Sequence, residues 1–468
     1  MTFAFTLLSL SASGLAVLHL ARLQTGRFTV DLPLAWFVGS GWFALGAMTL
    51  RFVGSVPYSR AAVMGILLAP VLLWTATRAA RWRAGAAPAQ RSGTSAARWL
   101  PRPRALFVPM AGYVVFMAAV TCLHGFNTPT QTDDGVRVRA FTPMLAFDDE
   151  WGSAAKPLLV MTGGIPTFVP SLAWRLTGTV DHFHVNYVVL ADLVALLILC
   201  VTLAATRGAP ERGWCMGFAL LSLPLFVYHC TSTYQDAVLA MYVGTGFLWF
   251  LEYGRTREVA DAGRALLLLA LATMVKREGL LVAVAIAAPL LVQLVWSRRR
   301  GFPVPWASLS IAGAFVILHV IAMAAAAGIL ESLPFLRIVA AHGSPGPLAY
   351  DAPLGPAARA FGYALFQSGN AGMLYWVLPA VLVLRPREAT RGEFGAPLLG
   401  VAALFALTAA SALWLAPVFT VNQMTVHRSL LAVSVAAALW VSAVISRDAC
   451  AEQRSSHLSG TAVGFGPA

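Results

Sequence analysis

The sequence predicts an all-α protein that crosses a membrane about eleven times. Of its 468 residues, 58% are hydrophobic and only 11% are charged, with a mean hydropathy of +0.72. Soluble domains do not show this balance. The apolar residues form runs of about 20, the length at which an α-helix crosses the bilayer core. Most arginines lie in short polar segments between these runs, where they set orientation in the membrane.

The apolar runs follow one another along the chain. We expect spans at residues 1–21, 33–51, 62–77, 105–123, 183–206, 213–230, 235–252, 303–329, 361–384, 394–416 and 428–446. The first run lacks the basic start of a cleaved signal peptide, so we expect it to be a retained helix.

The segment from Arg78 to Arg104 contains seven arginines and no acid, which indicates a cytoplasmic loop. Counting spans from this loop places the N-terminus outside and the C-terminus inside. Arg51 and Arg60 fit less well because they fall on the outer side. Loops at 207–212, 255–264, 298–300 and 385–391 are expected inside, and those at 124–182, 234–236, 330–358 and 417–427 outside.

The 33 residues between Arg264 and Arg298 are divided by the polar segment Lys276 to Gly279. The two arms have about 11 and 18 residues, which reach roughly 17 and 27 Å, against a hydrocarbon core of about 30 Å. We therefore expect a short hairpin of broken helices that does not cross fully and that leaves Lys276 within the membrane or its outer half. Such breaks are tolerated where they line a cavity.

The chain divides into three parts on this basis. Residues 1–104 form an N-terminal three-helix segment with the arginine-rich loop, 105–446 form a transmembrane core, and 447–468 form a polar cytoplasmic tail. The long outer loop 124–182 mixes apolar, aromatic and proline residues. This composition predicts short amphipathic helices at the outer interface, not a separate soluble domain.

Composition and motifs exclude several classes of function. The formal charge of +13 comes from arginines between spans, so nucleic-acid binding is not expected. Neither a GxxxxGK[ST] nor a GxGxxG phosphate-binding motif is present, and the five cysteines lack metal-ligand spacing. A membrane enzyme without a nucleotide site is expected to use a lipid-linked activated substrate. We expect a sugar on polyprenyl phosphate.

Three short polar segments interrupt the apolar chain, and we call them polar islands. The first is the acidic pair Asp133-Asp134, about ten residues after the fourth span. A carboxylate that is partly desolvated and lies beside another acid can act as a general base towards a hydroxyl. The alternative is a solvated turn, since Asp-Gly is also favourable turn chemistry. The later cluster Asp148 to Glu150 is more typical of a surface helix start.

The second island, Tyr234-Gln235-Asp236, begins a helix at its outer end. One interpretation is that the Asp236 carboxylate interacts favourably with the dipole at the helix N-terminus. The other is that it points into the same outer cavity as Asp134, where it would orient a polar group.

The third island, Lys276-Arg277-Glu278, places three charges at membrane depth, where each needs a partner. Phosphate is a suitable partner for the two cations, because lysine supplies a compact positive charge and arginine can donate two parallel hydrogen bonds. The alternative is an internal Lys276–Glu278 pair at a helix break. Arg428, at the outer start of the last span, is a second candidate phosphate ligand, or it reaches to the interface as a flanking arginine.

The order of these islands, with a proline-rich stretch between the first two, resembles the GT-C superfamily of integral membrane glycosyltransferases. The stretch is Gly164-Ile165-Pro166-Thr167-Phe168-Val169-Pro170, followed by Trp174 and Gly178. The pattern covers about residues 105–446. It is most similar to the bacterial branch related to dolichyl-phosphate-mannose protein mannosyltransferases and lipid A aminoarabinose transferases.

The resemblance implies an inverting transfer from a polyprenyl-phosphate sugar to a hydroxyl acceptor, on the periplasmic face of a bacterial inner membrane. It assigns the catalytic base to Asp133 or Asp134. It assigns binding of the donor phosphate to Lys276, Arg277 and Arg428. Tyr234, Asp236 and Glu278, which belong to the same polar segments, are also expected to bind substrate. The acceptor would be a lipid, a glycan or a protein. A divalent cation is compatible with the outward acids, but no spacing requires one.

Two features depart from the family pattern. About three helices precede the acidic loop instead of one, and the acidic pair is Asp-Asp instead of Asp-Glu or a lone Asp. A transporter or flippase of a lipid-linked or small polar substrate is the alternative function, because broken helices with charges near the midplane also form transport sites. No internal repeat supports that alternative, and a polysaccharide polymerase would carry its large outer loop later in the chain.

Overall fold

The computed structural model describes residues 2–83, 107–127, 163–178, 184–232, 234–276, 278–301, 304–327, 354–415 and 426–447. Within these ranges all regular structure is helical. Among the described residues, ten helices are long and apolar enough to cross a membrane, and a bent pair makes eleven if it is counted as one span. The prediction of an all-α, multi-pass membrane protein is therefore confirmed.

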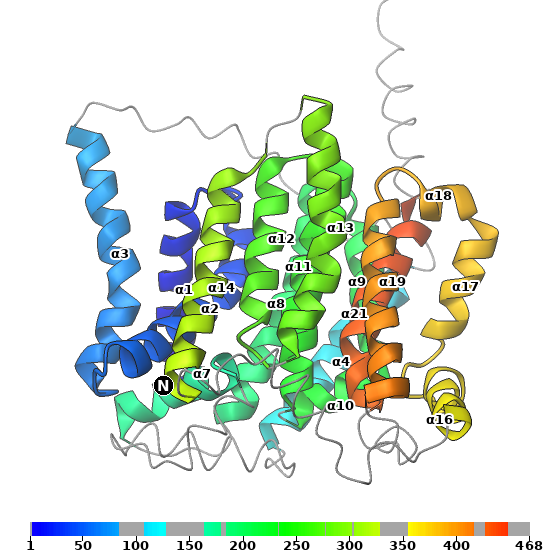
Figure 1. Cartoon of the computed structure of the whole chain (residues 1–468), viewed down its shortest axis with the longest axis horizontal. Coiled ribbons are helices and arrows are strands. Elements are labelled where there is room, and N and C mark those ends of the chain that lie inside the picture. The colour runs from blue at the N-terminus through cyan, green and yellow to red at the C-terminus, as the bar shows by residue number, and fades with distance from the viewer. Residues whose placement is uncertain are drawn as a thin grey trace, which may run out of the picture.

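Most of the helices run up and down between two ends of the molecule, and a few short ones lie across these ends (Figure 1). They are α1 (Thr2–Leu20), α2 (Phe28–Met48) with the π-helical turn Thr49–Val53, α3 (Arg60–Arg83), α4 (Phe107–Asn127), α7 (Ile165–Thr177), α8 (His184–Thr206), α9 (Pro210–Leu221), α10 (Pro224–Thr231), α11 (Gln235–Thr256), α12 (Val259–Ala272), α13 (Gly279–Arg299), α14 (Trp306–Ala327), α16 (Leu354–Phe366), α17 (Leu374–Leu384), α18 (Pro386–Thr390), α19 (Gly395–Ala410) with the π-helical turn Ser411–Leu415, and α21 (Val426–Ile445).

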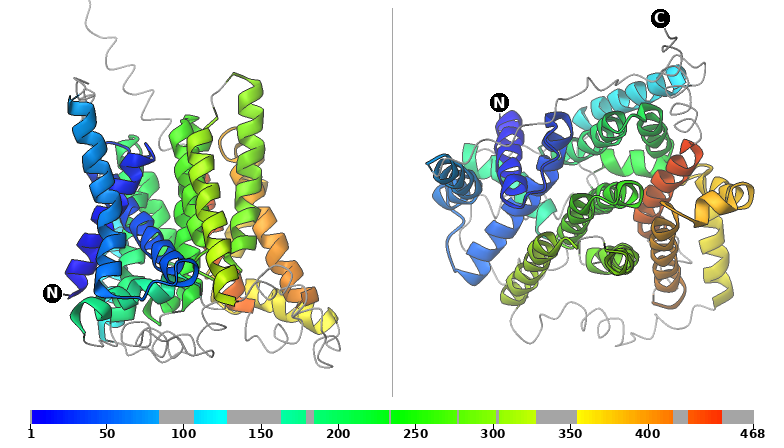
Figure 2. Two further views of the ribbon diagram at one scale, coloured as in Figure 1. Left: turned by 60° about the vertical axis from the view of Figure 1, so that its left-hand side comes forward. Right: turned by 90° about the horizontal axis from the view of Figure 1, so that it is seen from above.

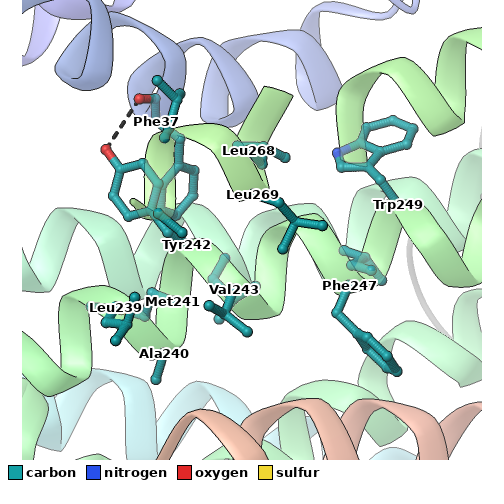
Figure 3. Close-up of a cluster of buried hydrophobic side chains, with 14 of the residues drawn as sticks. Phe37, Leu239, Ala240, Met241, Tyr242, Val243, Phe247, Trp249, Leu268 and Leu269 are labelled. Atoms are coloured by element: carbon teal, nitrogen blue, oxygen red, sulfur yellow. Dashed lines mark hydrogen bonds between the residues drawn. The ribbon is translucent and has the colours of Figure 1, made fainter. Parts of the chain in front are cut away.

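Helix α11 is the central element of this bundle. Every residue from Gln235 to Gly254 is buried, whereas α3 and α4 expose most of their surface. Figure 2 shows α3 at one edge of the bundle and α16 and α17 at the opposite edge. A helix that is apolar on all sides belongs in the interior. Figure 3 shows the side chains around α11, where the Tyr242 hydroxyl donates a hydrogen bond to the Phe37 carbonyl at 3.1 Å.

Ion pairs and hydrogen bonds join the helix ends in two separate groups. At one end Arg207 pairs with Glu258 at 2.7 Å, and Arg264 donates to the Leu23 carbonyl at 2.6 Å. At the other end the Gly164 amide donates to the Met274 carbonyl at 2.7 Å. The first group joins loops predicted to be inside. The second group includes the loop predicted to be outside, so the alternation of the spans agrees with the sequence analysis.

Two predicted spans are each broken in the structure. The span predicted at 213–230 consists of α9 and α10, which meet at an angle of 75°. Pro224 begins α10, and Leu223 before it is extended, because proline lacks an amide donor and disfavours helix in the preceding residue. The span predicted at 361–384 consists of α16 and α17, separated by a turn in which Gly369 and Gly372 have positive φ.

The hairpin predicted between Arg264 and Arg298 is present but asymmetric. Its first arm, α12, has 14 residues and a length of about 21 Å. Its second arm, α13, has 21 residues and a length of about 31 Å, which is enough to cross the bilayer core. The prediction that neither arm crosses was therefore wrong for α13, because the helix continues through Arg298 and Arg299 beyond the apolar run.

Two further polar contacts lie within the bundle, one in the first arm of this hairpin and one between α2 and α8. Arg264 lies inside α12, where it pairs with Asp261, so the predicted inner loop 255–264 is shorter than expected. In α8 the Asp192 carboxylate accepts a hydrogen bond from Trp36 Nε1 of α2 at 2.6 Å. This is the inter-helix bond that an isolated acid within a span predicts.

We predict that Gly39→Ala destabilises the protein, because α1 and α2 approach closely at Gly14 and Gly39. A Cβ on Gly39 would overlap the Leu10 carbonyl oxygen, and one on Gly14 would overlap the Ala35 carbonyl oxygen. Overpacking of this kind costs about 1–3 kcal/mol. The matched control is Gly65→Ala in α3, where a Cβ meets nothing within 4 Å. Thermal unfolding in detergent should show a lower midpoint for Gly39→Ala only; equal midpoints would contradict the close approach.

Candidate functional site

The carboxylate of Asp236 lies at the start of the central helix. Gln235 begins α11 and Asp236 occupies its first turn, where the helix dipole favours a negative charge. Among the described contacts, the carboxylate does not cap the helix. It bonds instead to two cations that come from distant parts of the chain.

The two cations are Lys276 and Arg428, and each takes one carboxylate oxygen. Lys276 Nζ donates to Asp236 Oδ1 at 2.9 Å. Arg428 approaches Asp236 Oδ2 through both Nε and Nη2, each at 2.8 Å. Short charged bonds of this kind are the strong class of hydrogen bond. The cluster therefore joins α11, the loop between α12 and α13, and the first turn of α21.

Backbone contacts fix the loop that carries Lys276. The amides of Gly164 and Ile165 both donate to the Met274 carbonyl, at 2.7 and 3.1 Å. Gly163 has a φ of +74°, and a Cβ there would overlap the Val275 carbonyl. Only glycine suits this combination of positive φ and close approach. The start of α7 is thus attached to the segment that positions Lys276.

Aromatic contacts fix Arg428. Its guanidinium carbon lies 4.6 Å from the centroid of the Tyr234 ring, within the range of a cation–π interaction. The Tyr234 ring in turn lies 4.4 Å from the His229 ring. The neighbouring His427 ring is hydrogen-bonded to the Asn370 side chain at 3.1 Å. Arg428 is therefore held in one orientation and is not simply a flanking arginine that reaches to the interface.

The cations are the more accessible part of the cluster. The side chain of Asp236 is 7% exposed, that of Lys276 20% and that of Arg428 28%. Glu278 lies at the edge, with its carboxylate 3.8 Å from Lys276 Nζ. Lys276 lies between α12 and α13, outside the spanning helices. Burial lowers the pKa of its ammonium, but the Asp236 and Glu278 carboxylates outweigh this and raise the pKa above its usual value, so the ammonium stays charged.

No protein-family model, curated protein or solved structure matches this chain. The site is therefore interpreted from its own geometry.

The structure brings together five of the eight residues that the sequence analysis selected. They are Tyr234, Asp236, Lys276, Glu278 and Arg428. The other three, Asp133, Asp134 and Arg277, lie outside the described residues. The main partner of Lys276 is Asp236 and not Glu278, which was the alternative considered from the sequence.

Two residues of the site were not selected from the sequence. His229, near the end of α10, contacts Tyr234, and Gln235 directly precedes Asp236. The sequence carries a signal for Gln235, since it belongs to the second polar island. His229 lies within an apolar run, and only the bend between α9 and α10 brings it to the cluster.

A metal site is not evident in the part of the chain that the structure describes, where no group of three or more His, Cys, Asp or Glu side chains is placed to hold an ion. The acids that suggested a divalent cation, Asp133 and Asp134 among them, lie outside the described residues.

A cavity of about 400 Å³ lies beside α10, on the surface formed with α4 and α9. The exposed surface of its lining is mostly apolar, although five of the eleven lining residues carry hydroxyl groups and one carries an imidazole. The lining residues are Tyr113, Met117, Val120, Thr121, His124, Leu221, Ser222, Pro224, Val227, Tyr228 and Thr231. Tyr228 and Thr231 of α10 line the cavity, while His229 between them contacts the site residue Tyr234. One short helix therefore separates an apolar cavity from a cationic cluster.

We predict that Asp236→Asn destabilises the protein by about 3 kcal/mol, because it leaves two partly buried cations without their counter-ion. The matched control is Glu393→Gln, which breaks a 3.9 Å pair with the half-exposed Arg447. It should cost less than about 1 kcal/mol. Chemical unfolding in detergent measures both. Adding Lys276→Met to Asp236→Asn should recover part of the loss, and equal losses for the two single variants would contradict the buried cluster.

Proposed function

We propose that this protein is a membrane glycosyltransferase that moves a sugar from a polyprenyl-phosphate donor to a hydroxyl acceptor. The observation that carries the proposal is the Asp236–Lys276–Arg428 cluster, in which the cations are more exposed than the carboxylate that holds them. A phosphate group suits such a pair, because lysine binds it as a point charge and arginine as a fork.

The position of the cluster supports a lipid-linked phosphate over a soluble one. The helix starts that form it belong to the end of the bundle predicted to face outward. The apolar cavity beside α10 is separated from the cluster by that one short helix and offers room for part of a hydrocarbon chain. A substrate with a phosphate between a polar group and a long apolar chain matches both features.

In the proposed reaction an acceptor hydroxyl loses its proton to the carboxylate of Asp133 or Asp134. The acceptor oxygen then forms a bond to the anomeric carbon, and the bond from that carbon to the phosphate oxygen breaks. The electron pair stays with the leaving polyprenyl phosphate. Lys276 and Arg428 stabilise this developing negative charge, the usual role of fixed cations at a leaving group.

Asp236 is assigned to holding the cations and not to proton transfer. Both of its oxygens accept hydrogen bonds from cations, at 2.8 to 2.9 Å. A carboxylate engaged in this way is a poor base, because accepting a proton would break the ion pairs that hold it. The base is therefore assigned to the acidic pair of the outer loop, as the resemblance implies.

The first test is sugar transfer in proteoliposomes, with labelled polyprenyl-phosphate sugars as donors and crude bacterial envelope as the source of acceptors. We expect Lys276→Gln and Arg428→Gln to lower the rate by about 10²- to 10³-fold, the usual loss when one stabilising donor is removed. One of Asp133→Asn and Asp134→Asn should abolish transfer. The matched control is Arg447→Gln, which removes an arginine just beyond the other end of α21 and should leave the rate unchanged.

The same assay separates the proposal from transport. The break between α12 and α13 places Lys276 in a gap between two helices, an arrangement that transporters also use for substrate sites. Labelled lipid that crosses the bilayer with its sugar still attached, with no labelled acceptor, would replace the transferase with a transporter or flippase. Transfer that is insensitive to Lys276 and Arg428 would contradict the assigned phosphate site.

A further inference from the structure

Two buried polar side chains beside the cluster have no role in the reaction as proposed. His229 and Gln235 are each only 3% exposed. His229 Nδ1 and Gln235 Nε2 are both buried, and neither has a hydrogen-bond partner among the residues that the structure describes. Buried polar groups in folded proteins are nearly always bonded, so each exception calls for an explanation.

His229 lies near the cations proposed to bind phosphate, and Gln235 is the residue before their carboxylate partner. The centroid of the His229 ring is 4.4 Å from that of the Tyr234 ring, and the Arg428 guanidinium lies over the same Tyr234 ring. The charged groups that act on His229 are Asp236, Arg428 and Lys276. Gln235 directly precedes Asp236 in the first turn of α11. Two unpartnered polar groups thus accompany the cluster from two different helices.

The side chains of His229 and Gln235 are uncharged hydrogen-bonding groups, in contrast to the charged side chains of the cluster. A glutamine amide nitrogen donates hydrogen bonds, and an imidazole nitrogen accepts in one tautomer and donates in the other. A hydroxyl group can both donate and accept, so it is a suitable partner for either atom. A phosphate, which only accepts and carries charge, fits the adjacent cations better.

We propose that His229 and Gln235 form a subsite for a hydroxyl of the sugar that the donor carries. This inference rests on the proposed function and deepens it, since Lys276 and Arg428 bind the phosphate while His229 and Gln235 bind the group attached to it. A ligand hydroxyl would supply the partner that both buried atoms lack.

The test compares the binding of two probes, polyprenyl phosphate and polyprenyl-phosphate hexose, to the full-length protein in detergent. The variants are His229→Phe, which keeps a ring against Tyr234, and Gln235→Met. Each should weaken the hexose-bearing lipid about tenfold, since a site built to bind a hydroxyl depends on its polar groups. Binding of polyprenyl phosphate should change less than twofold. Lys276→Gln should weaken both probes.

A second measurement separates this role from a structural one. Because neither atom has a partner to lose, His229→Phe and Gln235→Met should leave the thermal unfolding midpoint unchanged or raise it. The matched control is Tyr375→Phe, which removes a buried hydroxyl bonded to Ser434 Oγ at 3.0 Å. It should lower the midpoint without affecting the binding of either probe.

The outcomes distinguish this inference from the proposed function. Equal weakening of both probes, or unchanged binding of the hexose-bearing lipid, would overturn the subsite even if sugar transfer is observed. A lowered midpoint for both variants would assign the two side chains a structural role and also overturn it. If the wild-type protein binds neither lipid and transfers no sugar, the proposed function fails, and the subsite fails with it.

Discussion

The pairing of one buried carboxylate with two cations is the interaction on which the rest of this structure depends. An unpaired charge near the hydrocarbon core is costly, so Asp236, Lys276 and Arg428 must stay together wherever the helices place them. This requirement brings the start of α11, the gap after α12 and the start of α21 to one point. α12 ends at Ala272, and the turn that follows brings Lys276 to the carboxylate.

Close packing joins the helices of this bundle at several places. α11 is buried along its length, and α1 approaches α2 at two glycines that leave no room for a side chain. In a membrane such small-residue contacts drive helix association, because lipid chains are as apolar as the side chains they replace. The start of α7 adds backbone hydrogen bonds to the loop before Lys276. A rigid framework of this kind is what preorganised charge stabilisation needs.

Apolar runs of about 20 residues predicted correctly which segments form most of the long helices. The spans expected at 183–206 and 428–446 correspond closely to α8 and α21. The polar islands were also found from the sequence, since charges stand out within apolar runs. Local patterns say less about breaks inside an apolar run, so the bends at Pro224 and at 367–373 were missed. A proline within a span bends some helices and not others, as Pro70 within α3 shows.

The partners of the site residues could not be predicted in the same way. Asp236 and Arg428 are 192 residues apart, and one sequence does not say which helix faces meet. His229 looked like part of an apolar run, and only the change of direction between α9 and α10 brings its ring against Tyr234. The acidic pair of the outer loop stays a hypothesis from the sequence, because Asp133 and Asp134 lie outside the described residues.

The wide separation of the cluster along the chain has a consequence for biosynthesis. Asp236 enters the membrane 40 residues ahead of Lys276 and 192 residues ahead of Arg428, and ribosomes add about 5–20 residues per second. The carboxylate therefore waits roughly ten seconds or more, at those rates, before its second cation is synthesised. For most of that interval Lys276 is the only cation of the cluster that has been synthesised, and α11 lacks the packing of α21. A chain truncated before the last span would lack both Arg428 and the helix that packs against α11.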